Sequence, residues 1–148
     1  MVTRIQKMAL VPYTTHDMFV LVNEINDYPK FLPWCKSVTI HSRTQSDVVA
    51  TIMMGGAGLE KAFTTTNVIK LDKSIEMRLL EGPFSHLLGH WTFHPLGKEG
   101  CKISLDLEFD ISNPLLRMSL GPVFTKIANT LVDAFVTRAN ELYGHHSC

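Results

Sequence analysis

Alternation of hydrophobic and polar residues predicts a β-sheet through the middle of this chain. Every second residue from Cys101 to Ile111 is apolar, and the residues between them are lysine, serine, aspartate or glutamate. A period of two is that of a strand with one buried and one solvent-exposed face. Short turn-like joints between such segments favour an antiparallel meander. Further strands are expected in the opening residues and at 34–40, 48–54, 63–71, 75–79 and 87–93.

The periodicity changes after residue 111, where a long helix is expected. A capping asparagine followed by proline at 113–114 marks its start, and Tyr143-Gly144 is a helix stop. Gly121-Pro122 should kink or restart the helix, and residues 145–148 should form a frayed tail. The apolar side of this helix, which should lie across the dry face of the sheet, consists of Phe124, Ile127, Ala128, Leu131, Val132, Phe135 and Leu142.

Two short helices are expected between the first strand and the meander. The segment 14–17 offers capping oxygens for a helix over the apolar residues 18–22, and a second turn is expected at 25–31. The run YPKFLPWC follows at 28–35, with two prolines and three aromatic residues. Such a run is a poor helix or strand interior but a good stiff lid over a hollow interior. A rigid structural corner is an equally good interpretation, and the two are compatible.

Length and composition indicate one domain, assigned to residues 1–144. A chain of 148 residues buries roughly 70% of its surface on folding, so a single core is feasible without cross-links. Cys35, Cys101 and Cys148 are odd in number and widely spaced, which predicts a reducing compartment rather than a disulfide framework. We expect no signal peptide, and the sequence has no apolar run of transmembrane length. We therefore expect a cytoplasmic protein that contacts the inner face of the membrane at most transiently.

Charge and short motifs exclude several kinds of site. Fourteen Lys and Arg balance fourteen Asp and Glu, so the overall charge does not favour nucleic acid, and no DNA partner is expected. The glycine-rich segment 55–58 lacks the lysine and hydroxyl residue of a phosphate-binding loop and is expected to be a hairpin loop. His90 and His94 would lie about 13 Å apart on a strand. They cannot share a metal on their own, so no metal site is predicted.

Several runs of residues carry a resemblance to a known family. They are VNEINDYPKFLPWC at 22–35, FTT at 63–65, GPF at 82–84, LGHWTF at 88–93 and LVDAF at 131–135. From about residue 7 to residue 144, the chain resembles the START-like (polyketide cyclase/dehydrase-like) lipid-binding superfamily. Within it, the chain is most similar to the branch of the ribosome association toxin RatA and the coenzyme Q-binding proteins. This resemblance implies an α+β helix-grip fold, in which a curved antiparallel sheet of about six or seven strands wraps around a long C-terminal helix, with two short helices after the first strand.

The resemblance also implies a cavity that binds a hydrophobic ligand. We expect ubiquinone or a related polyprenyl quinone, held without chemical change and delivered to respiratory or biosynthetic enzymes. Burial of an isoprenoid tail contributes ~0.8 kcal/mol per methylene before ordering costs. Taken singly, each aromatic or methionine residue is more often part of a core than a ligand contact. The expected lining is Phe31, Trp34, Phe63, Met77, Phe84, Trp91, Phe124, Leu131 and Phe135, with Tyr28 and Thr65 as polar contacts for the headgroup.

The same fold is compatible with two other functions. The same branch includes factors that bind the large ribosomal subunit and block subunit association. This alternative needs a basic surface for RNA. The superfamily also includes aromatase/cyclase enzymes, which need positioned acid and base groups in the cavity, and the inward positions predicted above carry none. We therefore expect a non-enzymatic protein without a cofactor.

The basic surface that the ribosome-binding alternative needs could be formed only in part. The candidate residues are Lys61, Lys70, Lys73, Arg78 and Lys102.

Overall fold

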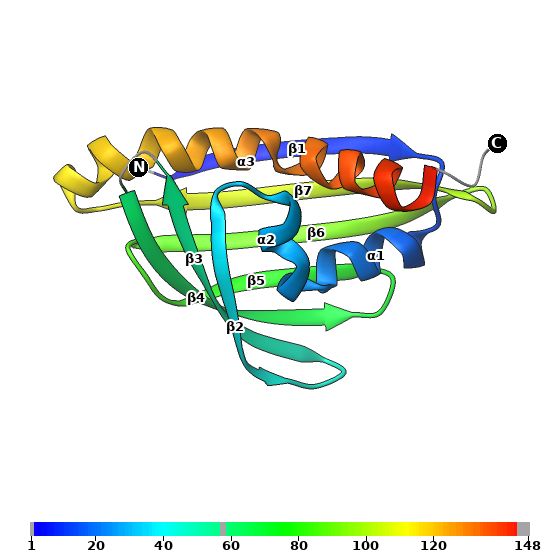
Figure 1. Cartoon of the computed structure of the whole chain (residues 1–148), viewed down its shortest axis with the longest axis horizontal. Coiled ribbons are helices and arrows are strands. Elements are labelled where there is room, and N and C mark those ends of the chain that lie inside the picture. The colour runs from blue at the N-terminus through cyan, green and yellow to red at the C-terminus, as the bar shows by residue number, and fades with distance from the viewer. Residues whose placement is uncertain (1, 57–58, 145–148) are drawn as a thin grey trace.

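One antiparallel sheet with a long helix across it forms the protein (Figure 1). The computed structural model describes residues 2–56 and 59–144, and its seven strands follow the order β1-β7-β6-β5-β4-β3-β2. This is the α+β helix-grip fold expected from the sequence. The strands are β1 (Thr3–Val11), β2 (Cys35–Arg43), β3 (Asp47–Gly56), β4 (Leu59–Lys70), β5 (Ser74–Glu81), β6 (His86–Leu96) and β7 (Gly100–Asp110). The helices are α1 (Thr15–Asn23), the 3-10 turn η1 (Ile25–Asp27), α2 (Tyr28–Phe31) and α3 (Pro114–Tyr143).

The predicted alternation is confirmed along β7, which lies between β1 and β6 in the sheet. Along β7 every second residue from Cys101 to Phe109 is buried, and those between are half-buried. Strand β7 pairs with β6 on one side and with β1 on the other, where Thr3 lies opposite Phe109. Neighbouring strands therefore present their apolar residues on the same face, and α3 covers that face (Figure 1).

Helix α3 begins as the sequence predicts but does not restart at its internal proline. The side chain of Asn113 accepts hydrogen bonds from the backbone nitrogens of Leu115 and Leu116, which caps the helix. The helix then runs unbroken through Pro122 to Tyr143. A proline removes one backbone hydrogen bond, but here Leu120 and Phe124 are buried on either side of it. Their burial favours one continuous helix over a break at Pro122.

One residue predicted for the buried side of α3 lies outside it. Leu142 is 43% exposed, whereas Ala139 is fully buried. At the C-terminal end the inward position is taken by Tyr143, whose ring packs against Tyr13 with a centroid distance of 5.6 Å. The neighbouring Leu142 points about 100° away, because a helix turns by that angle per residue.

The N-terminal helices form the expected pair of short elements. Thr14 caps α1 by accepting a hydrogen bond from the backbone nitrogen of Asp17. The second predicted turn consists of η1 and α2, which lead into β2. Strand β2 starts at Cys35, and its register shifts before Ser37, so Trp34 precedes the strand rather than sharing its alternation.

Two sequence predictions fall on residues that are not described. The frayed tail at 145–148 lies outside the described residues, as does the tip of the predicted hairpin at 57–58. On either side of that tip, β3 and β4 pair up to Gly56 and Leu59.

A candidate apolar ligand site beneath the C-terminal helix

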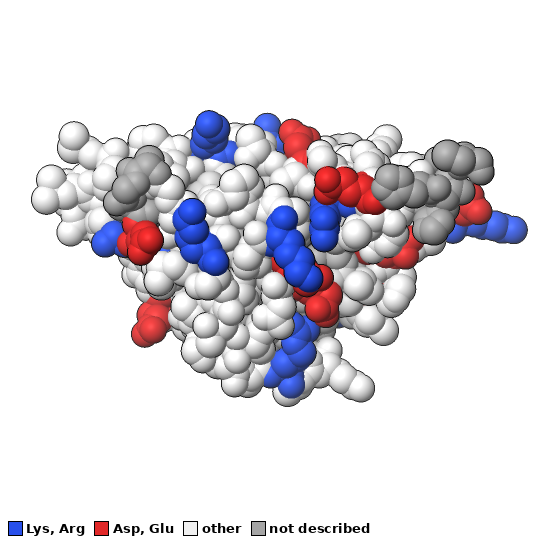
Figure 2. All heavy atoms as spheres, viewed as in Figure 1, with Lys and Arg blue, Asp and Glu red and all other residues white. Residues whose placement is uncertain are grey.

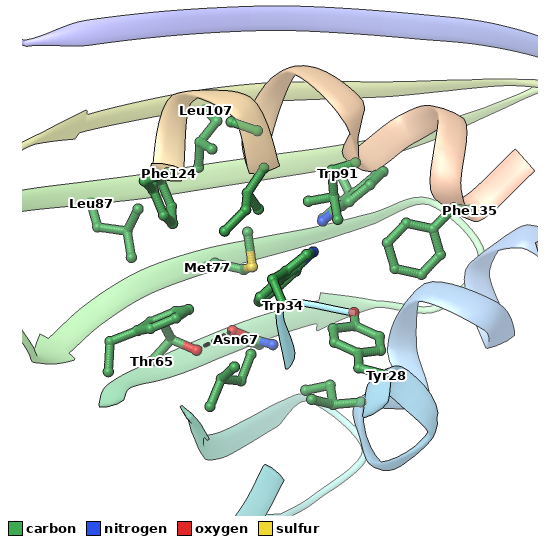
Figure 3. A pocket seen from close by; sticks show the side chains of 16 residues that line it. Tyr28, Trp34, Thr65, Asn67, Met77, Leu87, Trp91, Leu107, Phe124 and Phe135 are labelled. Carbon is green, nitrogen blue, oxygen red and sulfur yellow. Dashed lines mark hydrogen bonds between the residues drawn. The ribbon is translucent and has the colours of Figure 1, made fainter. Parts of the chain in front are cut away.

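An apolar cavity lies between the sheet and α3 (Figure 3). Its volume is about 60 Å³, which is room for a handful of water molecules at ~10–15 Å³ each. Most of the residues predicted as a lining do surround it: Tyr28, Trp34, Phe63, Thr65, Met77, Trp91, Phe124, Leu131 and Phe135. The residues of its wall that were not predicted as a lining are Ile25, Ile52, Asn67, Leu87, Leu107, Ile127 and Ala128.

The periodicities of the surrounding elements explain how these residues meet. Strand β4 contributes Phe63, Thr65 and Asn67, which are consecutive inward positions at the period of two. On β5, Met77 lies opposite Gly89 of β6, where an added Cβ would collide with its side chain. The absence of a side chain at Gly89 thus leaves Met77 room to lie along the cavity wall. The flexible thioether suits a wall whose shape must adapt.

Two predicted lining residues, Phe31 and Phe84, are packed outside the cavity. The centroid of the Phe31 ring lies 5.3 Å from that of Phe135, and the guanidinium of Arg138 lies over the Phe31 ring. Phe84 packs among the rings of Phe63, Phe109 and Phe124. Both residues therefore pack behind the cavity wall, because the rings that they contact, Phe135 for Phe31 and Phe63 and Phe124 for Phe84, are the ones that line the cavity.

Tyr28 is poorly placed to donate a hydrogen bond to a headgroup. Its hydroxyl already donates to the backbone oxygen of Val22. Burial raises the pKa of this hydroxyl above its usual range, and the nearby Cys35 adds to the rise. Burial also raises the pKa of the Cys35 thiol to about 11. Both groups are therefore neutral at physiological pH.

Strand β4 gives the cavity two polar side chains, Thr65 and Asn67. The Thr65 hydroxyl donates a hydrogen bond of 3.0 Å to Oδ1 of Asn67 (Figure 3). Among the described residues, the lining includes no carboxylate, imidazole, thiol or amine, and no cluster of metal-ligating side chains occurs. The arrangement suits binding through apolar contact and hydrogen bonding. It does not supply the charged acid and base groups of a general acid–base mechanism.

An open groove runs along the outside of the same wall. Its volume is about 650 Å³, within the range of ~300–1,000 Å³ that ligand pockets occupy. Trp34, Ile127 and Leu131 line both the groove and the cavity. Of these three residues, Trp34 and Leu131 are half-buried. We call these two side chains the partition, because they separate the cavity from the groove.

The five basic residues considered for RNA contact are spread over the protein. Lys61 and Lys70 lie near opposite ends of β4, about 30 Å apart at ~3.3 Å per residue. Lys73 shares the β4–β5 turn with Lys70, Arg78 forms an ion pair of 2.9 Å with Glu76, and Lys102 is on β7. Figure 2 shows Lys and Arg mixed with Asp and Glu on the face that carries α2 and β2. No helix among the described residues is long and apolar enough to cross a membrane.

The family follows from comparison with known sequences. The pattern of the family described as "Polyketide cyclase / dehydrase and lipid transport" matches residues 11–136, and the chain belongs to this family. It is 47% identical to the "Ribosome association toxin RatA" of Pseudomonas aeruginosa, over 97% of this chain and 100% of that protein. The protein of the same name from Escherichia coli is 41% identical, over 95% of this chain and 89% of its own length.

More distant similarities are to one sequence relative and to solved structures. The mitochondrial "Coenzyme Q-binding protein COQ10" of Drosophila melanogaster is 25% identical, over 93% of this chain and 59% of its own length. The Zhui aromatase/cyclase from Streptomyces superposes with a TM-score of 0.82 at 17% identity, over 95% of this chain and 94% of that chain. A START superfamily protein from Mycobacterium smegmatis gives 0.79 at 19% identity, over 94% and 98%. At these identities the solved structures establish the START-like fold, not the activity.

Proposed function

We propose that this protein is a ribosome-association factor that binds the large ribosomal subunit and blocks the joining of subunits. The observation that carries this proposal is the 47% identity to a ribosome association toxin along almost the whole of both chains. The proposal reverses the order of the sequence-based expectations, which placed quinone binding first. Binding to the subunit requires no chemical reaction, and we propose that this binding takes place in the cytoplasm.

Contact with ribosomal RNA would involve basic side chains, and the structure offers them singly rather than as one patch. Lys61 and Lys70 are too far apart to act as one cluster, and neither forms an ion pair with another described residue. Neutralisation of phosphates by such lysines releases counterions, so binding should weaken as the salt concentration rises.

The first prediction concerns purified large ribosomal subunits. We expect the wild-type protein to co-sediment with them and to reduce the formation of whole ribosomes when small subunits are added. Binding should fall with salt, and a variant that loses one phosphate contact should lower the slope of log affinity against log salt by about 1. The variants are Lys61→Glu and Lys70→Glu, measured by sedimentation at several salt concentrations.

Lys98→Glu in the β6–β7 turn is the matched control, because it makes the same change in charge on an exposed residue. We expect it to bind as the wild type does, while at least one of the other two variants binds more weakly. A wild-type protein that neither binds large subunits at low salt nor alters subunit joining would contradict the proposal.

A second function, binding of a hydrophobic ligand, is favoured by the apolar lining of the cavity and by the apolar residues Trp34, Ile127 and Leu131 that it shares with the groove. Ubiquinone is the first ligand to test, in keeping with the distant coenzyme Q-binding relative. The enclosed cavity, at about 60 Å³, is smaller than the ~300 Å³ of a small ligand pocket. Binding would therefore need the partition at Trp34 and Leu131 to move, joining the cavity to the groove.

The corresponding prediction is made for Leu131→Arg, which places a charge in this partition. We expect a quinone to co-purify with the wild-type protein and to be lost from the variant, because an apolar tail cannot offset the burial of an unpaired guanidinium. Solvent extraction and mass spectrometry measure the bound ligand.

Leu142→Arg supplies the control, since it adds the same side chain to the exposed side of the same helix. It should retain the quinone. Wild-type protein that is free of quinone, even after quinone has been added, would argue against this second function.

A further inference from the structure

Asn67 is an amide buried in an apolar environment. It is 5% exposed and lies on β4 between Val48 of β3 and Met77 of β5. Asparagine is uncommon in strand interiors, and a buried amide is costly unless its hydrogen bonds are made. The partners of its oxygen and its nitrogen therefore decide whether this burial is tolerated.

Within the protein, only the oxygen of this side-chain amide has a hydrogen-bond partner. Oδ1 of Asn67 accepts the hydrogen bond from Thr65, whereas Nδ2 has no hydrogen-bond partner among the described residues. The residue lines the cavity (Figure 3), so this nitrogen presents two N–H donors to a space that is lined mostly by apolar side chains. A molecule with a hydrogen-bond acceptor would satisfy them.

The charge of the cavity lining restricts which hydrogen-bond acceptor a ligand can place beside Asn67. Among the described residues, no lysine, arginine or histidine lines the cavity. A carboxylate or phosphate would therefore be buried there without a counter-charge, which is strongly unfavourable. A neutral carbonyl group, as in a ketone, quinone or ester, needs only the N–H donors.

The partition then sets the orientation of the ligand. Asn67 lines the inner cavity and not the groove, and Trp34 and Leu131 separate the two spaces. A molecule that reaches Asn67 must pass this partition with its polar end first. Its apolar remainder then lies in the groove, along Val123 and Ile127 of α3.

We propose that Asn67 is a ligand-binding residue that donates a hydrogen bond to a neutral carbonyl group, at the inner end of an apolar ligand whose tail occupies the groove. This inference rests on the hydrophobic-ligand function proposed above and specifies its chemistry. It replaces Tyr28 as the principal polar contact of the headgroup and gives Thr65 the role of orienting Asn67.

The test uses Asn67→Leu, which keeps the size of the side chain and removes the donors. The probes are a short-chain ubiquinone and an analogue with the same prenyl tail on a ring that has no carbonyl groups. Binding is measured by quenching of tryptophan fluorescence, since Trp34 and Trp91 line the cavity. We expect the variant to bind the quinone about tenfold more weakly, equal to about 1.4 kcal/mol, and to bind the carbonyl-free analogue as the wild type does.

The outcomes separate this inference from the function on which it rests. If the wild-type protein binds neither probe, both are overturned. If wild type and Asn67→Leu bind the quinone equally, the hydrophobic-ligand function stands and the role of Asn67 is wrong.

A second measurement does not depend on the folding of the variant. In nitrogen-15 spectra of the wild-type protein, the two side-chain N–H signals of Asn67 should shift with the quinone and much less with the carbonyl-free analogue. Equal shifts with both probes would overturn the proposed hydrogen bond. A fatty acid, as a third probe, should bind more weakly at neutral pH than its methyl ester.

Discussion

Replacing Phe135 with alanine is expected to lower the free energy of unfolding by about 3–5 kcal/mol. Phe135 is fully buried, and its ring is in contact with three others. The centroid distances are 5.4 Å to Tyr28, 5.3 Å to Phe31 and 5.2 Å to Trp91. Each such pair adds ~0.5–1.5 kcal/mol beyond the area buried, so the loss should lie towards the upper end. Chemical denaturation followed by circular dichroism measures it.

Leu142→Ala is the control for this change, because it shortens an exposed side chain on the same helix. We expect it to alter stability by less than ~0.5 kcal/mol. A loss below about 1.5 kcal/mol for Phe135→Ala would mean that the ring cluster contributes far less than its burial implies. A charged residue at Phe135 would unfold the protein, which is why the half-buried Leu131 is the better position for testing ligand binding.

The second large effect is expected from Gly82→Ala, in the turn between β5 and β6. Gly82 has φ of +153°, a conformation that residues with a side chain rarely adopt, at a cost of ~1–3 kcal/mol. An added Cβ would also lie 2.7 Å from Cβ of Phe63 and 3.1 Å from its Cα. Since backbone cannot move as freely as a side chain tip, we expect a loss of stability at the upper end of that range. Thermal and chemical unfolding measure it.

Gly97→Ala separates backbone strain from collision. Gly97 also has a positive φ, of +66°, but nothing lies within 4 Å of the position that a Cβ would take there. This variant should lose ~1–2 kcal/mol. If Gly97→Ala were as destabilising as Gly82→Ala, the close approach of Gly82 to Phe63 would have no energetic weight. Because Phe63 lines the cavity, Gly82→Ala should also weaken ligand binding.

The strands and the main helix could be predicted because their periodicity is a local property of the sequence. In β7 each side chain is assigned to a face by its place in the alternation, and the structure agrees along the strand. Pro122 shows the limit of such local rules. The rule that proline ends a helix takes no account of Leu120 and Phe124, whose burial on the sheet keeps α3 continuous.

The composition of the cavity was less predictable, because periodicity identifies a face but not the neighbours on it. Phe31 and Phe84 have the residue type of a lining, yet they pack behind it. Asn67 was missed for the opposite reason, since a polar residue in a strand is normally assigned to the wet face. The signal available was its position, two residues after Thr65 and four after Phe63 on the inward side of β4.

The pairing of the first strand with the last has a consequence for the order of assembly. Ile5 of β1 lies opposite Leu107 of β7, so β1, which is synthesised before the other strands of the sheet, acquires its partner only when nearly the whole sheet has been made. Loop closure over such a separation is slow. Until it happens, the nascent chain displays an unpaired strand with the apolar side chains of Ile5 and Val11, which makes this edge a natural place for a chaperone to bind or for aggregation to begin.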